Sequence, residues 1–515
     1  MQDWSITSMH ADPITYVTVY QPPQVSVQCR IIAYINRGCG QQGKVFMSSI
    51  FVELRDELDR QAVEFPLMPV GQAVDMGQAE DGTPLIDPRI FDAPEFFRNP
   101  YPYYRILRDH YPVYHDRLHN TYWVTRYDDI TACYFDDEGF NTIPKGSSNG
   151  VLGNTQLELS GVEHRRRRNL YGQHLVGKSL NLRVPAIARL AREMIAAWEH
   201  AGDCDFITQA NGKRTVELGK AFADEFPIRV VCEVLGFPQQ AQSDFYYWYH
   251  SMMSGLGGSS THKQGVEARQ HLEDYVAGIV DARRRQPTYL YDEAGNPTGK
   301  DIISKLCETR IDGDFLSTEE ITSNIALIVG GGGETTRGAI MNLWCLLLRH
   351  PEQYEAVLKD DSCWDLAFHE MLRHSSSIGG QPRQNSVDVE MHGVHIPAGS
   401  LMQMVDFSAN HDERIFQDPE TFNILRDDLY TGKLLRSGFR KDGKCNHMAF
   451  GVGPHLCPGA WISHQETVGG SRILAETLKN VRIREDLMPK DIDNQTPAPM
   501  GIMSVRSLWL EYDLA

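Results

Sequence analysis

A short glycine-rich loop near the end of the chain constrains its fold more than any other feature. The loop, FGVGPHLCPGA, spans residues 450–460 and holds one cysteine, Cys457. Glycine allows tight turns and lets a backbone approach a flat ligand without a Cβ in the way. Because proline is favoured at the first position of a helix, Pro458 predicts that Cys457 lies at or beside an N-cap. The N–H groups and partial positive charge of a helix N-terminus stabilise a thiolate, so the loop is suited to present one thiolate to a metal.

Two other interpretations of this loop stay open on its own sequence. A lone cysteine is most often a small buried apolar residue. A glycine-rich loop that opens a helix can also hold a phosphate, although this one lacks a G-K-[ST] ending and an evident G-x-G-x-x-G pattern. If the metal is haem iron, an axial thiolate supplies electron density that favours O–O cleavage.

Composition excludes several classes of function. The chain has 515 residues, of which 41% are apolar and 23% charged, as is ordinary for a soluble globular protein. A formal net charge of -18 argues against nucleic acid as the main partner. The ten cysteines are scattered, without a C-x-x-C pair or a C-x-x-C-H haem attachment site. This pattern predicts a reduced, cytoplasmic protein in which any haem is held non-covalently.

Neither a signal peptide nor a membrane span is expected. The first residues, MQDWS, lack a basic region followed by an apolar run. The most apolar long stretch, 321–348, contains Asn324, Glu334, Arg337 and Asn342. Because these side chains would be costly in lipid, the stretch is interpreted as a buried core helix.

Residues 1–85 look unlike the rest of the chain. Alternating patterns predict strands at 14–20 and 25–35, and a charged helix is expected at 51–63. Residues 66–84 are rich in Pro, Gly and Asp, as in a linker. The segment is interpreted either as a small appended domain or as the product of an upstream start codon.

Residues 86–515 are predicted to form one mainly helical domain with small β-sheets, an α+β arrangement. Helical spacing is found at 183–200, 216–235, 245–256 and 266–285. Short strands are expected at 122–127, 387–394 and 401–405, and a long polar loop at 140–160.

A second unusual stretch is LIVGGGGETT at residues 327–336. Its flanks are apolar and helical, yet each glycine inside a helix costs about 1 kcal/mol relative to alanine. Such a penalty is tolerated where a bulge or kink opens a functional groove. Glu334 and Thr335 would place a carboxylate and a hydroxyl beside the groove, which are the groups needed to relay protons to bound dioxygen. The alternatives are a flexible glycine linker and a phosphate loop that has lost its lysine.

Further residues gain meaning only in combination. Glu370 and Arg373 are three positions apart and would face each other on a helix. His164 and Arg168 lie one helical turn apart, and Arg383 follows a glycine pair. Arginine binds carboxylates with fork geometry, so these groups could hold the propionates of a haem. A solvated basic face is the alternative for most of the run at 165–168.

Together these motifs, in this order, resemble the cytochrome P450 family of the soluble bacterial kind. The loop matches F-G-x-G-x-H-x-C-x-G, residues 331–336 match small-Gly-x-acid-Thr-Thr, and residues 370–373 match E-x-x-R. The segment from Ala409 through Phe422 also resembles the part of the family that precedes the loop. The resemblance covers most of the chain, from about Asp87 to the C-terminus. It implies a P450-like fold with haem b, iron protoporphyrin IX, between the glycine-containing helix and the cysteine loop.

The resemblance also implies roles for individual residues. Cys457 is expected to be the iron ligand, and Thr335 and Glu334 to serve oxygen activation and protonation. Glu370 and Arg373 are expected to be structural. The expected propionate ligands are His455, Arg383, His164 and Arg168. The other residues expected to contact the haem are Phe450, Gly451, Gly453, Gly459, Gly331 and Gly332.

The implied reaction is insertion of one oxygen atom of O2 into a small apolar organic substrate, by hydroxylation or oxidative dealkylation. Electrons would come from a separate ferredoxin and its reductase. Aromatic residues and methionines at 245–253 suggest an apolar, adaptable lid. The alternatives are peroxide-driven chemistry, oxidative coupling or rearrangement, and a non-enzymatic haem sensor.

Two segments depart from the family pattern. One is residues 1–85, and the other is an insertion at about 429–446 that carries Lys433, Arg436, Arg440, Lys441 and Lys444. Because the insertion directly precedes the cysteine loop, its positive charge is interpreted either as a docking site for an acidic electron carrier or as a solvated loop.

Overall fold

In the computed structural model, the described residues are 77–93, 95–96, 99–142, 150–153, 155–238, 242–257, 262–291, 296–429, 442–489 and 503–514. The chain divides into two compact units, Met1–Gln72 and Ala73–Ala515, and all described residues belong to the second. The strands and helix expected at 14–63 lie outside them. In the second unit, the hydroxyl groups of Tyr111 and Tyr114 donate to the carbonyls of Pro84 and Ile86. These contacts attach residues 84–86 to the helices and strands that follow them.

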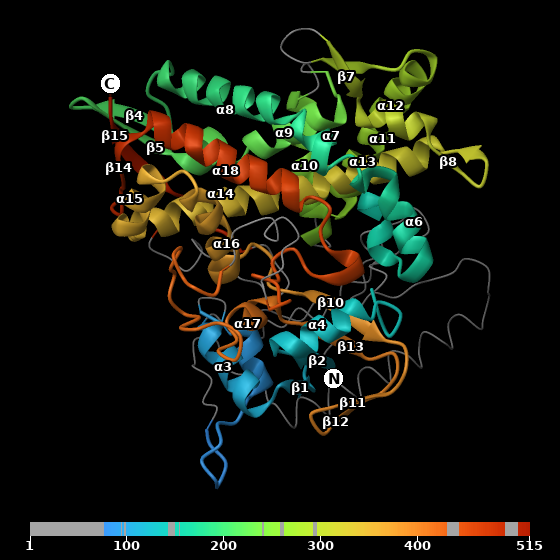
Figure 1. Cartoon of the computed structure of the whole chain (residues 1–515), viewed down its shortest axis with the longest axis vertical. Coiled ribbons are helices and arrows are strands. Elements are labelled where there is room, and N and C mark those ends of the chain that lie inside the picture. Colours follow the sequence, from blue (N-terminus) through green and yellow to red (C-terminus); the bar gives the residue numbers. More distant parts are fainter. Residues whose placement is uncertain are drawn as a thin grey trace, which may run out of the picture. The chain divides into compact units, whose positions relative to one another are not determined.

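The second unit is mainly helical (Figure 1). Its α-helices are α3 (Tyr101–His110), α4 (Tyr127–Phe135), α6 (Gly161–Gly172), α7 (Gly177–Asn181), α8 (Val184–Glu199), α9 (Phe226–Leu235), α10 (Gln242–Gly257), α11 (His262–Arg285), α12 (Ile302–Glu308), α13 (Thr318–Gly332), α14 (Glu334–Arg349), α15 (Pro351–Lys359), α16 (Cys363–Ser375), α17 (Asp406–Asn410) and α18 (Ala460–Thr477). Shorter helical turns are η1 (Pro88–Asp92), η2 (Gln156–Glu158), η3 (Gly219–Ala223) and η6 (Gly453–His455).

The strands form small sheets, as predicted for the fold class. One sheet has the order β1-β2-β13-β10-β3, and another the order β14-β15-β5-β4. The pair β2–β13 is parallel, whereas the other pairs in these two sheets are antiparallel. The hairpins are β6–β7, β8–β9 and β11–β12. The strand bounds are β1 (Val113–Asp116), β2 (Thr121–Val124), β3 (Phe140–Asn141), β4 (Ile207–Ala210), β5 (Lys213–Glu217), β6 (Tyr289–Tyr291), β7 (Pro297–Lys300), β8 (Arg310–Ile311), β9 (Asp314–Phe315), β10 (Gln381–Asn385), β11 (Val389–Met391), β12 (Val394–Ile396), β13 (Leu401–Met404), β14 (Lys479–Ile483) and β15 (Trp509–Asp513).

Two local predictions were partly wrong, and both errors have a physical reason. Of the helix expected at 216–235, the first two residues belong to β5, because Val216 and Glu217 pair with Leu510 and Trp509 in β15. That strand partner is almost 300 positions away, so local spacing carries no trace of it. Helical structure follows as the turn η3 from Gly219 and as α9 from Phe226. The strand expected at 387–394 is instead divided between β11 and β12. The turn at His392 and Gly393 has positive φ at both residues, which suits a tight hairpin.

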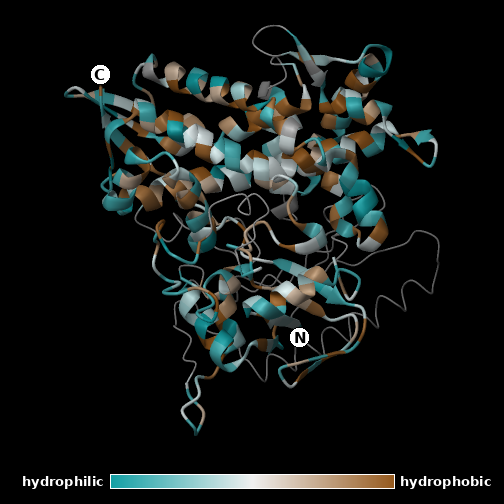
Figure 2. Ribbon diagram, in the orientation of Figure 1, coloured by the Kyte–Doolittle hydropathy of each residue, from teal (hydrophilic) through white to brown (hydrophobic). Residues whose placement is uncertain are grey.

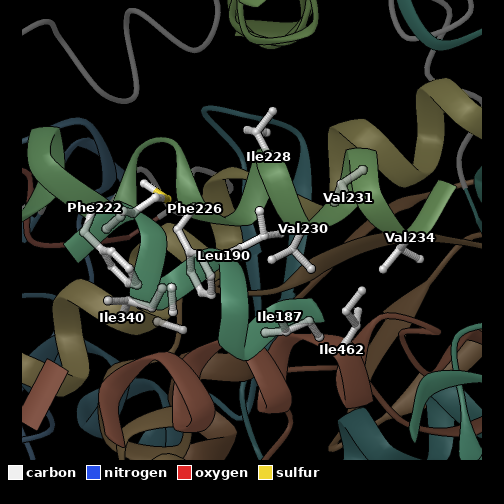
Figure 3. Packing of buried hydrophobic residues seen from close by; sticks show 14 of the residues in the cluster. Ile187, Leu190, Phe222, Phe226, Ile228, Val230, Val231, Val234, Ile340 and Ile462 are labelled. Carbon is white, nitrogen blue, oxygen red and sulfur yellow. The ribbon is translucent and has the colours of Figure 1, made fainter. Parts of the chain in front are cut away.

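The core is made by helices that lie against one another with their apolar sides (Figure 2). Figure 3 shows Ile187 and Leu190 of α8, Phe226 of α9 and Ile340 of α14 packed together. The rings of Phe222 and Phe226 stack with centroids 4.5 Å apart. Burying each large apolar side chain contributes roughly 1.5–3 kcal/mol. This core supports α14 and α18, the helices that begin at the two glycine-rich motifs.

A buried ion-pair network fixes the segment that precedes the cysteine loop. Arg373 donates to both carboxylate oxygens of Glu370, at 2.8 and 2.9 Å, and both side chains are fully buried. Arg373 also donates to the carbonyls of Asn410, Pro419 and Thr421. Arg426 adds a second cation on Glu370. A single solvated helix pair would not be arranged in this way, so the sequence interpretation of the Glu370–Arg373 pair as structural fits these contacts.

Candidate active site

The cysteine loop is closed by its own backbone. The amide of Cys457 donates to the carbonyl of Phe450 at 2.8 Å, and the amide of Gly451 donates to Met448 at 2.8 Å. Gly451 and Gly453 both have positive φ, at 66° and 72°. A Cβ on Gly453 would also lie 2.7 Å from the carbonyl oxygen of Tyr134. The glycines at these two positions are therefore required by backbone conformation and, at Gly453, by close approach to α4.

Helix α18 begins slightly later than the sequence suggested. Its N-cap is Gly459 and its first residue is Ala460, so Cys457 precedes the cap by two residues. Burial raises the pKa of the Cys457 thiol, while hydrogen bonds from the amides of Gly459 and Ala460 and the charge of Arg168 act in the opposite direction. The helix N-terminus still donates to the sulfur, and these donors favour its charged form.

Four nitrogen-bearing side chains surround the start of this loop, and we call them the cradle: His164, Arg168, Arg383 and His455. His164 and Arg168 come from α6, Arg383 from β10 and His455 from η6. The imidazole rings of His164 and His455 stack with centroids 3.7 Å apart. The guanidinium of Arg383 lies 4.8 Å from the centre of the Tyr134 ring. Three separate parts of the chain thus bring their donors to one place.

The cradle has nitrogen atoms without hydrogen-bond acceptors. Among the described residues, none accepts from His164 Nδ1, His455 Nε2 or Arg383 Nε, although all three atoms are buried. Burial is the main reason that the pKa of His164 is lowered to about 4 and that of His455 to about 3. Unpaired buried donors are expensive. A group with two carboxylates would satisfy them, so these residues fit the propionates of a haem.

The sequence did not reveal one member of this neighbourhood, Asp137. Its buried carboxylate accepts from the amide of Gly161 at 2.9 Å and lies 3.6 Å from His455 Nε2. Asp137, His164 and His455 can bring one ligand atom each within 4.8 Å of one another. The sequence around Asp137, DDEG, does not indicate that this aspartate lies beside the cradle, because its partners come from other elements.

The long apolar helix is broken at its glycine run, as the sequence predicted. Helix α13 ends at Gly332 and α14 begins at Glu334. A Cβ on Gly331 would meet no atom within 4 Å. A Cβ on Gly332 would lie 2.7 Å from Val231, and one on Gly333 only 2.3 Å from the Tyr249 ring. The open side is therefore at Gly331, whereas Gly332 lies against α9 and Gly333 against α10.

Thr335 and Glu334 lie at the first turn of α14. The hydroxyl of Thr335 donates to the carbonyl of Gly331 at 2.8 Å, across the break. Glu334 is half-buried and lies 3.9 Å from Arg337. The next hydroxyl, of Thr336, contacts Ser463 of α18 at 3.3 Å. This contact ties the helix break to the helix that follows Cys457.

Two apolar side chains, Leu152 and Met253, cover the preceding turn of α13. A Cβ on Gly330 would lie 2.9 Å from the methyl group of Met253 and 3.3 Å from Leu152. Met253 belongs to α10, the segment for which the sequence suggested an adaptable lid. Tyr249 of the same helix fills the break itself.

Most of the basic insertion lies outside the described residues. Lys444 is described, and its ammonium pairs with Asp128 at 2.5 Å and lies 5.3 Å from the centre of the Tyr127 ring. Among the described helices, none is both long and apolar enough to span a bilayer.

Comparison with known proteins identifies the class. The sequence profile of the cytochrome P450 family matches residues 364–506. Pulcherriminic acid synthase of Bacillus subtilis is 26% identical over 79% of this chain and 95% of its own length. The vitamin D(3) 25-hydroxylase of Pseudonocardia autotrophica is 28% identical over 72% of this chain and 84% of its own. The solved structure of cytochrome P450 CYP109Q5 from Chondromyces apiculatus has a TM-score of 0.66 and 25% identity, covering 82% of this chain and 98% of that one.

The helical fold, its small sheets and these relatives define a haem-thiolate oxidoreductase. In sequence and in fold the chain is similar to the cytochrome P450 family, whose profile matches residues 364–506. The relatives include enzymes named as a steroid C26-monooxygenase and a vitamin D(3) 25-hydroxylase.

Proposed function

We propose that this enzyme inserts one oxygen atom of O2 into an apolar organic substrate, by hydroxylation or oxidative dealkylation. The observation that carries the proposal is the set of unsatisfied nitrogen atoms in the cradle, which includes Arg168 beside Cys457. A haem whose iron carries a thiolate ligand supplies the dioxygen chemistry when it is bound. The chain contributes the ligand, the carboxylate holders and the proton-handling groups.

Cys457 is the proposed iron ligand, and the cofactor is proposed to be haem b. The closed loop holds the sulfur against the amides of Gly459 and Ala460. Those donors stabilise negative charge on sulfur and limit its exposure to protons. Phe450, Gly451, Gly453 and Gly459 shape this loop so that a flat ligand can approach it.

The cradle is proposed to hold the two propionates. Arg168 and Arg383 bring permanent positive charge, and His164 and His455 bring ring N–H donors. Because burial lowers the pKa values of both histidines, the pair is neutral when free and gains a hydrogen-bond acceptor when a carboxylate arrives. Charge-assisted hydrogen bonds of this kind are about twice as strong as neutral ones.

On the oxygen side, Thr335 and Glu334 are proposed to hold and pass protons. The Thr335 hydroxyl donates its hydrogen bond to the carbonyl of Gly331. Its oxygen lone pairs can therefore accept a hydrogen bond from another donor. Glu334 is half-buried next to Arg337, and can exchange protons with solvent. Gly331 leaves the space between them unfilled, and Gly332 supports the break through its contact with α9.

The substrate is proposed to be apolar, because Leu152 and Met253 cover α13 next to the break. Methionine side chains adapt to irregular apolar shapes. A steroid C26-monooxygenase and a vitamin D(3) 25-hydroxylase are among the relatives, which supports an apolar substrate.

Electrons are proposed to come from a separate ferredoxin and its reductase. The cluster of lysines and arginines at 433–444, in a chain of net charge -18, supports docking of an acidic carrier. The domain organisation is proposed to be a haem domain at residues 86–515, preceded by an extension at 1–85 that is either a small appended segment or the product of an upstream start codon.

The spectrum of the reduced, carbon-monoxide-bound protein tests the proposal directly. We expect the strongly red-shifted Soret band of a thiolate-ligated haem, and we expect Cys457→Ser to abolish it. Cys445→Ser is a matched control, because Cys445 is buried near the loop and its amide hydrogen-bonds to Tyr127. Persistence of the band in Cys457→Ser would assign the iron ligand elsewhere.

Turnover measurements separate the alternatives. A monooxygenase of the proposed kind converts substrate with NAD(P)H, a ferredoxin and its reductase. A peroxide-driven enzyme would work with hydrogen peroxide alone, and a haem sensor would convert nothing under either condition.

A further inference from the structure

The proposed function leaves one buried acid unused: Asp406, the first residue of α17. Its side chain is only 2% exposed. Both of its oxygens accept from the hydroxyl of Tyr134, at 2.9 and 3.1 Å. Ionised carboxylates are almost never buried without a cation in direct contact. The described cations include none within ion-pair distance of Asp406, so the carboxyl needs a physical explanation.

Tyr134 connects this acid to the cradle. Its ring is 1% exposed and lies against the guanidinium of Arg383, whose side chain is 6% exposed. Asp406 and Arg383 therefore contact the same tyrosine, one at its hydroxyl and the other at its ring. Arg383 acts electrostatically on Asp406 without bonding to it. Its Nε has no acceptor among the described residues and is free to meet a propionate.

Other charged groups near α17 are directed elsewhere. Arg108 of α3 donates to the carbonyl and hydroxyl of Ser408. Arg373 of α16 donates to the carbonyl of Asn410. His411, just after α17, pairs with Glu420. On α4, which also packs against α17, Tyr134 is the residue that contacts the acid, and Cys133 beside it feels the charge of Arg383.

We propose that Asp406 is a positioning residue for the haem propionates: it is held as a neutral acid behind Arg383 near neutral pH, and at alkaline pH, where it is ionised, it would take up a proton on reduction of the bound haem. The proposal rests on the proposed function of the cradle. When Asp406 is neutral, the positive charge of Arg383 is not partly compensated by it and acts fully on a propionate. Ionised Asp406 would compete for that charge and would repel the propionate.

The direction of the titration agrees with this role. Burial raises the pKa of Asp406 to about 8, against the opposing effects of Tyr134 and Arg383. The carboxyl is therefore mainly protonated at neutral pH. Propionates nearby would raise its pKa further, because like charges disfavour ionisation. The cradle is thus complete below about pH 8 and weakens as the pH rises through the pKa of Asp406.

Reduction links the acid to electron transfer. At a pH where Asp406 is ionised, delivery of one electron to a bound haem by an external donor would be accompanied by one proton from solvent to a carboxylate oxygen of Asp406, so that the local charge would be unchanged. Adding an electron raises the pKa of a nearby acid. The midpoint potential should therefore be independent of pH below about 8 and fall at higher pH, until the acid is ionised in both redox states.

Spectroelectrochemical titration of the haem-loaded protein, repeated between pH 6 and pH 10, tests this inference. We expect the wild type to show the alkaline fall in potential and Asp406→Asn to lose it. Infrared difference spectra recorded on reduction at alkaline pH should show a carboxylic acid C=O band that is missing in Asp406→Asn. Asp116→Asn is a matched control, since Asp116 is also buried but pairs with His119 instead of the cradle.

A second variant keeps the test decisive if Asp406→Asn does not fold. Tyr134→Phe retains the ring against Arg383 and removes the donor that favours the charged acid. The fall in potential should then begin at a higher pH. An alkaline fall that is the same in Asp406→Asn as in wild type, or unshifted in Tyr134→Phe, would overturn the inference. Failure of the proposed function looks different, because the thiolate-type carbon monoxide spectrum would then be missing from the wild type.

Discussion

At the scale of single residues, the four consecutive glycines have different surroundings. Gly330 lies under Met253, Gly332 against Val231 and Gly333 against Tyr249, while Gly331 faces open space. Three of them are therefore small because neighbouring helices approach closely. Only Gly331 keeps space open for a ligand. The run is a packing motif with one functional position rather than a uniform groove.

Removing the hydroxyl of Thr335 should change the reaction without changing the fold. We predict that Thr335→Ala keeps its haem and its carbon monoxide spectrum, but diverts electrons into hydrogen peroxide, so that product formed per NAD(P)H falls several-fold. The physical reason is the loss of a proton-holding group beside Gly331. Thr335→Ser retains the hydroxyl and should restore coupling. Full coupling in Thr335→Ala would remove the threonine from the proposed relay.

At the scale of elements, the break between α13 and α14 is held in place by α9 and α10. Val231 of α9 and Tyr249 of α10 occupy the positions that side chains at Gly332 and Gly333 would need. The hydroxyl of Thr336 then joins α14 to α18 through Ser463. The break is thus held by α9 and α10, and the Thr336–Ser463 contact joins it to the helix that follows the cysteine loop.

This packing predicts opposite effects for two neighbouring substitutions. Gly332→Ala should lower the free energy of unfolding by roughly 1–3 kcal/mol, because its Cβ would overlap Val231. Gly331→Ala meets nothing within 4 Å and should be neutral or slightly stabilising. Urea denaturation of both proteins measures the difference.

Adding Val231→Ala to Gly332→Ala should recover part of the loss, because the clashing methyl group is then removed. If the two glycine variants have equal stability, or if Val231→Ala brings no recovery, the contact with α9 does not determine the identity of residue 332.

At the scale of the whole domain, several buried histidines are kept neutral. His447 hydrogen-bonds to His369 at 3.0 Å, and burial is the main reason that the pKa of His447 is lowered to about 3. The pKa of His374 is likewise lowered to about 3 by burial. Both belong to the region behind the cysteine loop, next to Phe450 and the Arg373 network.

These histidines should make the fold sensitive to acid. In the unfolded chain these histidines become protonated near pH 6.5, whereas in the folded chain they stay neutral to a much lower pH. The unfolded state therefore binds more protons, and the free energy of unfolding falls as the pH drops below about 6.5. Below pH 6.5, one fully buried histidine such as His447 lowers the free energy of unfolding by up to about 1.4 kcal/mol for each pH unit. Unfolding free energies measured between pH 7.5 and pH 5 should decline accordingly.

The histidine contribution can be isolated with two variants. His447→Gln should flatten the acid decline, whereas replacing the exposed His271 by Gln should leave it unchanged. An unchanged slope in His447→Gln would show that carboxylates alone cause the acid sensitivity.

The amino-acid sequence by itself determined the class of this protein. The Cys457 loop, the glycine run and the Glu370–Arg373 pair are local patterns, and each carries its chemistry within a few consecutive residues. Helices α8, α10 and α11 were also predictable, because helical periodicity is a local property. The strand β5 was missed, since its partner β15 is remote in the chain.

Only the tertiary structure decided how the site is assembled. The cradle joins α6, β10 and η6, and the sequence could place its members together only through the family resemblance. Asp137, Tyr134 and Asp406 gave no sequence signal, because a lone acid or tyrosine acquires its role from burial and from neighbours on other elements. The same holds for the glycine run, where contacts with α9 and α10 separate Gly331 from the rest. A motif of consecutive residues can be recognised in the sequence, because its side chains are close together in any fold. Burial and electrostatic coupling depend on distant segments and exist only once those segments have packed.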